Sequence, residues 1–102
     1  MYIVMDLEFN CSNNSYVSEK NGVRLPNEII EIGAVKLDDD LNELDRFCSF
    51  IKPAVYTKIN TEVKKLTDIT NDMVYQGVEF PEAITNLDHI IGSIFIWIKN
   101  ER

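Results

Sequence analysis

Cysteine and histidine are scarce in this sequence, which has two cysteines, Cys11 and Cys48, and a single histidine, His89. The cysteines do not stand in the spacing of a metal-binding motif. Cys11 has no histidine near it in sequence that could activate it as a nucleophile, so we expect no catalytic role for it. Cys48 alternates with Phe47 and Ser49 in an expected strand, which predicts that it packs in the core. No segment that could serve as a signal peptide precedes the first apolar run, so we expect a cytoplasmic protein with reduced thiols.

Basic residues are also few, because 10 lysines and arginines stand against 17 acids, for a formal net charge of −7 at pH 7. This balance argues against a non-specific nucleic-acid coat and against binding to an anionic membrane surface. It does not exclude a nucleic-acid enzyme, which can hold the end of a nucleic-acid strand through metal ions and a few nearby basic side chains. The one basic cluster consists of Lys58, Lys64 and Lys65. We expect it on a solvated helix face; the more specific alternative is that these lysines contact phosphates. No apolar run reaches transmembrane length, and 102 residues suffice for one small domain.

The first nine residues organise the chain. Met1–Phe9 begins with an unbroken apolar run, which predicts a strand buried on both faces, and two acids, Asp6 and Glu8, stand near its end. Alternate side chains of a strand point to the same face, so Asp6 and Glu8 should project together while Leu7 points into the core. Roughly 6.5 Å of backbone separates two such carboxylates, which suits the ligation of Mg²⁺ or Mn²⁺. The plainer interpretation is a strand that ends in solvent with two solubilising acids, and the motif alone does not decide between the two.

The remaining pattern predicts an α/β fold. A polar loop from Asn10 to Asn27 leads to a second strand, in which Glu31 is expected to face outward. The later elements are expected as strands Glu28–Leu37 and Leu44–Lys52 around the turn Asp38–Asn42, helices starting at Asn60, Thr70 and Pro81, and a fourth strand Ser93–Ile98. A right-handed crossover would place the fourth strand beside the first and parallel to it, with the long helix on one face of the sheet. Glu101 would then lie near the two acids of the first strand.

Five segments, in this order, carry a resemblance: Val4–Phe9, Pro26–Val35, Phe50–Pro53, Leu66–Thr70 and Phe80–Ala83. Together they resemble the DnaQ-like DEDD 3′–5′ exonucleases, in the branch of KapD and the histone-mRNA exonucleases. The resemblance implies a ribonuclease H-like fold, a mixed sheet whose first three strands are antiparallel. It also implies removal of nucleoside monophosphates from the 3′ end of single-stranded RNA or DNA by a water that two divalent ions activate, Mg²⁺ or Mn²⁺.

The resemblance assigns roles to residues of this chain. It implies that Asp6 and Glu8 are catalytic metal ligands, with Glu8 also near the attacking water. It further implies that the terminal nucleotide is contacted by the backbone of Leu7 and by Leu66 and Thr67. These assignments rest on the family pattern and not on composition or spacing.

The later motifs of the family depart from the pattern. Trp97–Glu101 resembles the second motif but ends in Glu101 where the family has Asp, so Glu101 would be a metal ligand with a longer reach. The third motif, with its histidine and aspartate, is absent, and His89 lies on the wrong element to replace it. We therefore expect residues 1–102 to be the N-terminal portion of an exonuclease domain, truncated before the third motif and with little or no activity.

Alternative interpretations remain open at this point. One is a non-catalytic interaction module that retains the exonuclease fold. An aspartyl-phosphate phosphatase ranks lower, because that class needs Asp-x-Asp followed by a helix. If Ser93–Ile98 forms an exposed edge strand, it could also pair two copies into a homodimer.

Overall fold

The computed structural model describes residues 1–13, 18–20 and 23–91, and the predicted α/β architecture is confirmed. The described elements are β1 Tyr2–Asn10, β2 Ser18–Lys20, β3 Val23–Leu25, β4 Glu28–Leu37, β5 Glu43–Phe50, α1 Thr61–Thr67, α2 Asn71–Tyr75 and α3 Phe80–Ile91. The predicted fourth strand Ser93–Ile98 and the predicted ligand Glu101 lie outside the described residues.

β1, β4 and β5 form an antiparallel sheet with β4 in the centre. The predicted hairpin of β4 and β5 is confirmed, although β5 ends at Phe50 and not at Lys52. Its turn is closed by a hydrogen bond from the Asp38 amide to the Asn42 carbonyl at 2.9 Å. The Asp38 carboxylate also accepts from the backbone amides of Asp40 and Asn42, each at 2.9 Å. A short polar turn of this kind fixes the register of both strands.

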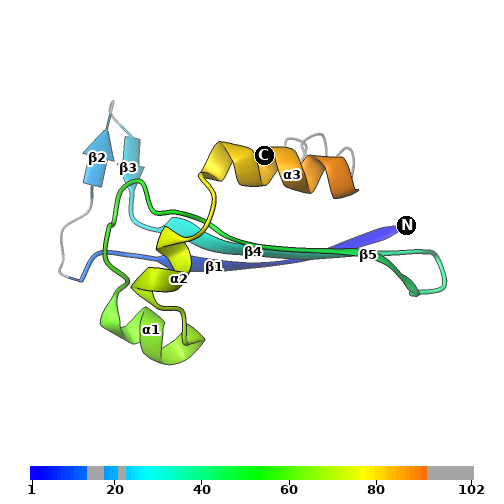
Figure 1. Cartoon of the computed structure of the whole chain (residues 1–102), viewed down its shortest axis with the longest axis horizontal. Helices are drawn as coiled ribbons and strands as arrows, with labels where there is room; N and C mark the ends of the chain where they lie inside the picture. The colour runs from blue at the N-terminus through cyan, green and yellow to red at the C-terminus, as the bar shows by residue number, and fades with distance from the viewer. Residues whose placement is uncertain (14–17, 21–22, 92–102) are drawn as a thin grey trace.

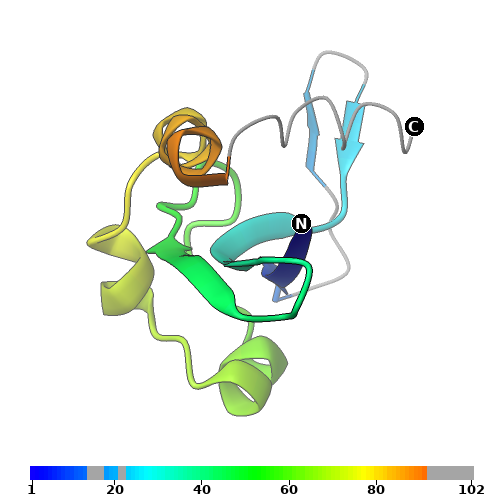
Figure 2. The ribbon, with the colours of Figure 1, turned by 90° about the vertical axis from the view of Figure 1, so that its right-hand side faces the viewer.

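Helices pack on both sides of this sheet. Figures 1 and 2 show α3 over one face and α1 near the opposite face, with α2 at a level between them. The larger core lies under α3 and consists of Ile32, Ala34, Phe47, Ile51, Ala83, Leu87 and Ile91. The smaller core lies under α1 and α2 and consists of Ile30, Ile59, Ile69 and Val74. Each large aliphatic side chain buried in this way contributes about 1.5–3 kcal/mol.

The short helices start where the sequence predicts. The Asn60 side chain accepts from the backbone amides of Glu62 and Val63, at 2.8 and 3.3 Å, and so caps α1. Thr70 caps α2 through the amide of Met73 at 3.3 Å. These caps satisfy backbone donors that a helix end otherwise leaves unpaired. Among the described residues, no helix has the length and apolar composition needed to cross a bilayer.

A β-bulge interrupts the pairing of β1 with β4. Glu8 lies opposite Glu31, but the next residue, Phe9, lies opposite Ile29, so β4 carries one extra residue, Ile30. At this bulge two successive side chains, those of Ile30 and Glu31, point to the same side of the sheet. Ile30 is fully buried in the smaller core, while Ile29 packs against the larger core on the other side.

Three expectations from the sequence are wrong. β1 is not buried on both faces, since Tyr2 and Val4 are 54% and 56% exposed, because α1 and α2 cover only one end of their face. The loop from Asn10 to Asn27 contains the hairpin of β2 and β3. Cys48 is exposed and does not pack in the core, because it lies on the same incompletely covered face.

Candidate active site

The two acids of β1 project from the same face of the sheet, as predicted. Asp6 lies opposite Gly33 of β4, and Glu8 lies opposite Glu31. Asp6 is exposed and Glu8 is half-buried. Gly33 has no side chain, so the space next to the Asp6 carboxylate stays open. Neither carboxylate forms a hydrogen bond or ion pair with another residue in the part of the chain that the structure describes, which leaves the oxygens of both available to a ligand.

Leu7 points away from the acids. Its side chain is half-buried and packs against the core under α3. Of Leu7, only the backbone can therefore face a ligand held by Asp6 and Glu8, and its contact with the terminal nucleotide stays a prediction.

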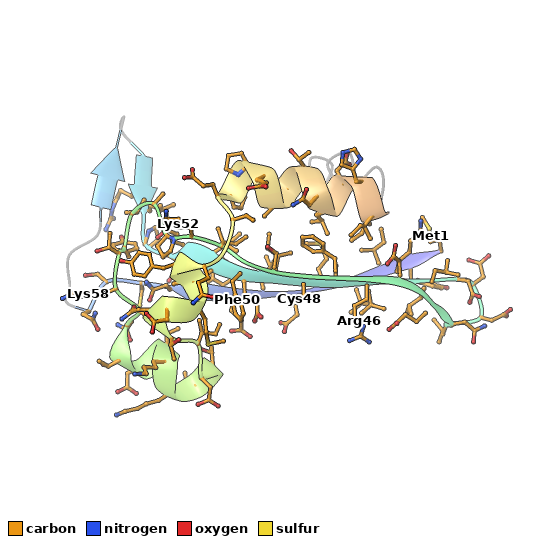
Figure 3. All side chains as sticks on the ribbon, in the orientation of Figure 1. Met1, Arg46, Cys48, Phe50, Lys52 and Lys58 are labelled. Carbon is orange, nitrogen blue, oxygen red and sulfur yellow. The ribbon has the colours of Figure 1, made fainter. Side chains whose placement is uncertain are left out.

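Glu31 brings a third carboxylate to this face, which the sequence analysis treated only as an outward-facing residue. It lies directly across from Glu8 and accepts a hydrogen bond from the Cys48 thiol at 3.5 Å. Figure 3 shows Cys48 and Arg46 pointing from β5 to the side of the sheet that carries α1. Partial burial and the Glu31 carboxylate both raise the pKa of the Cys48 thiol. An acid within an apolar strand was the available signal, but which residue lies opposite it depends on the register of β1 with β4.

The acids do not form a complete metal cage by themselves. Within residues 1–13, 18–20 and 23–91, no three histidine, cysteine, aspartate or glutamate side chains converge closely enough to hold a metal ion. Two carboxylates still fit Mg²⁺ or Mn²⁺, because Mg²⁺ is commonly held by one or two carboxylates, with waters and phosphate oxygens completing its shell.

α1 lies on the same side of the sheet as the acids, since Asn10, two residues beyond Glu8 on β1, contacts the residue that caps this helix. Leu66 in its last turn is 84% exposed, so it packs in neither core. The Thr67 hydroxyl donates to the Val63 carbonyl at 2.8 Å and accepts from the Ile69 amide at 3.2 Å. The end of α1 thus presents an exposed apolar side chain beside a threonine held in place by its own helix.

The basic cluster is solvated, as expected. Lys58, Lys64 and Lys65 are all exposed. Lys65 pairs with Glu62 at 3.5 Å, and a surface pair of this kind contributes little to stability.

A cavity of about 480 Å³ lies on the other side of the sheet, at the start of α3. Its lining is mainly apolar and includes Phe9, Ile29, Pro53 and Phe80. Because Phe9 follows Glu8 on β1 and points to the opposite face, this cavity is not continuous with the acidic pair.

The fold and the acidic strand end define an exonuclease-type domain of ribonuclease H-like architecture, and comparisons with known proteins give the family. Residues 3–102 match the exonuclease family RNase_T, and the chain belongs to this family. It is 31% identical to KapD of Bacillus subtilis (strain 168), described as a probable 3′–5′ exonuclease, over 88 residues that cover 86% of this chain and 40% of KapD. It is also 31% identical to the PolC-type DNA polymerase III of Staphylococcus haemolyticus (strain JCSC1435), over 93% of this chain and 6% of the polymerase.

Solved structures support the same family. A full-length 3′-exonuclease superimposes with a TM-score of 0.68 at 27% identity, covering 85% of this chain and 27% of the exonuclease. The nuclease domain of 3′hExo, a DEDDh family member bound to rAMP, superimposes with a TM-score of 0.65 at 25% identity, covering 97% of this chain and 44% of that domain. The chain therefore spans less than half the length of these relatives.

Proposed function

We propose that this chain supplies the acidic strand and the nucleotide-contacting helix of a 3′–5′ exonuclease that acts on the 3′ end of single-stranded nucleic acid by two-metal hydrolysis. Family membership and the exonuclease relatives support the reaction type. A 3′-exonuclease with the histone mRNA stem-loop and a nuclease domain with rAMP support a 3′ end as the ligand. The observation that carries the proposal is the common face of Asp6 and Glu8, whose carboxylates have no partner among the described residues.

Asp6 and Glu8 would hold the divalent ions, Mg²⁺ or Mn²⁺, with Glu101 proposed from the sequence as a further ligand. Such ions, when bound, lower the pKa of a coordinated water and offset phosphate charge. Two carboxylates directly opposite each other in a sheet repel, so the facing positions of Glu8 and Glu31 make this face more favourable for a cation.

The chain's own residues would then position the substrate. Leu66 offers an exposed apolar surface on which a terminal base can pack, and Thr67 fixes the end of the helix beside it. The backbone of Leu7 runs between the two acids. Together these groups would orient the terminal nucleotide relative to the bound ions.

We further propose that this 102-residue polypeptide has little or no nuclease activity of its own. Its single histidine, His89, lies on α3, which packs against the face of the sheet opposite to the acids, and its side chain is exposed. It is therefore in no position to take a proton from a water held near Glu8. General acid–base catalysis contributes about 10²–10⁴-fold, so its absence alone would make turnover slow.

Calorimetric titration with Mn²⁺ tests the metal site. The wild-type chain should bind Mn²⁺, and the double variant D6N/E8Q should lose at least about tenfold in affinity, since it removes both proposed carboxylate ligands. The double variant E82Q/D88N is the matched control, because it removes the same charge from exposed positions on α3. Equal losses in both variants would mean that only net charge attracts the ion. A wild-type chain that does not bind Mn²⁺ would favour the non-catalytic interaction module.

A homodimer through Ser93–Ile98 stays a prediction of the sequence. Light scattering at high protein concentration measures it, and a monomer there would contradict it.

A further inference from the structure

The connection between β5 and α1 is held by two side chains at one end of the sheet. Asn10 is the last residue of β1, Glu28 is the first residue of β4, and the two are partners in the strand register. Both reach into residues 54–60, which lead into α1. Because α1 carries Leu66 and Thr67, this connection sets where the end of that helix lies relative to the acids.

Asn10 is completely buried, and it is the only polar or charged residue that is buried in the described part of the chain. Its amide nitrogen donates to the carbonyl of Lys58 at 3.0 Å and to that of Tyr56 at 3.4 Å. Its amide oxygen accepts from the backbone amide of Asn60 at 2.8 Å. An asparagine amide has both donors and an acceptor to offer, and here each is used. A buried side chain in this state strongly determines the position of the backbone that it binds.

The next link is the N-cap of α1. The Asn60 side chain caps the helix with its oxygen, and its nitrogen donates to the Ser12 carbonyl at 2.8 Å. The path from the acidic strand to α1 is therefore short: Asn10 lies two residues beyond Glu8 and binds the capping residue directly.

Glu28 holds the other end of the connection. Its carboxylate accepts from three successive backbone amides, Ala54 at 2.8 Å and Val55 and Tyr56 at 3.0 Å each. Hydrogen bonds from backbone amides to a carboxylate are among the stronger ones in proteins. Asn10 and Glu28 thus bind the donors and acceptors of one segment from two adjacent strands.

We propose that Asn10 and Glu28 are positioning residues, which fix α1, and with it Leu66 and Thr67, relative to Asp6 and Glu8. The inference rests on the proposed function, because only a nucleotide that touches both the acids and α1 makes this distance matter for binding. Small displacements of groups that act together on one ligand have large effects, and a shift of about 1 Å can cost about 10²-fold in rate.

Two measurements on N10A and E28Q test this. Amide hydrogen exchange in residues 56–67 should become at least about tenfold faster in both variants while exchange in β4 changes little, since exchange reports local opening. In the presence of Mn²⁺, the affinity for AMP should fall at least about tenfold, whereas the affinity for Mn²⁺ alone should stay within about twofold. A merely structural role would not separate these two affinities.

Asn71→Ala is the matched control. The Asn71 side chain accepts from the Ile59 amide at 2.8 Å, so this variant removes a hydrogen bond to the same segment from α2 and not from the sheet. It should leave the AMP affinity within about twofold of wild type. Unchanged exchange in α1 of N10A and E28Q would overturn the inference, as would an AMP loss in N71A as large as theirs. A wild-type chain that does not bind AMP would instead overturn the proposed function, and the exchange measurement would still decide whether Asn10 and Glu28 hold α1. E28Q decides the matter if N10A does not fold.

Discussion

Gly77 offers a stability prediction that can be worked out from distances. It lies between α2 and α3, where the Val78 amide donates to the Phe50 carbonyl at 3.2 Å and the Lys52 amide donates to the Val78 carbonyl at 2.7 Å. A Cβ on Gly77 would stand 2.6 Å from the Phe50 carbonyl carbon and closer still to its oxygen. Because these are backbone atoms and cannot rotate away, the two segments must separate. Overpacking and the weakening of both hydrogen bonds predict that Gly77→Ala lowers the free energy of unfolding by about 2–4 kcal/mol.

Thermal unfolding followed by circular dichroism measures this effect. For a domain of this size, the predicted loss corresponds to a fall in Tm of roughly 10–30 °C. Gly33→Ala is the control, since its Cβ would meet only the Asp6 carbonyl oxygen at 3.7 Å, an ordinary contact. Gly33→Ala should change the stability by less than about 1 kcal/mol, with a gain expected from the stiffer unfolded chain. A fall in Tm below about 4 °C for Gly77→Ala, or equal losses in both variants, would refute the argument from the backbone clash.

Three further outcomes follow from particular side chains. Ile30→Ala empties a fully buried position and should cost about 2–5 kcal/mol in urea unfolding, and a loss below about 1 kcal/mol would contradict the packing of the smaller core. Hydrogen bonds from the Asn42 backbone and side chain, with one from the Asp40 backbone, lower the pKa of Asp38 below its ordinary 3.8, so its stabilising effect is present above pH 3.8 and is lost as the pH falls through the lower folded-state pKa. The stability difference between wild type and Asp38→Ala should therefore shrink below pH 3.8, and a difference independent of pH would contradict this. Since Glu31 raises the pKa of Cys48, Glu31→Gln should speed alkylation of that thiol near pH 8, and an unchanged rate would show that Glu31 has no such effect.

Local signals in the sequence predicted much of the framework. The common face of Asp6 and Glu8 follows from the twofold repeat of a strand, which no tertiary contact has to supply. The caps Asn60 and Thr70 were likewise predicted, because their side chains bond to amides only two or three residues away. The long helix followed from the spacing of its buried residues.

Features that depend on distant parts of the chain could not be predicted. The exposure of Cys48 depends on which elements cover its face of the sheet, and that of Leu66 depends on what packs against α1; neither residue's neighbours in sequence contain that information. The hairpin of β2 and β3 has strands of three residues, too short for a periodic pattern. The pairing of Glu8 with Glu31 was missed because it depends on the register between two strands that are separated by the segment from Cys11 to Asn27.

Because of that bulge, β4 contributes neighbouring side chains to both hydrophobic cores. Ile29 and Ile32 pack in the core under α3, and Ile30 packs in the core under α1 and α2. Deleting Ile30 would restore regular pairing, with Glu31 still opposite Glu8 and Ile29 still opposite Phe9, and would remove the side chain that β4 contributes to the smaller core. This single irregularity in the central strand thus lets β4 contribute to the core under α1 and α2 while Glu31 keeps its place beside the acidic pair.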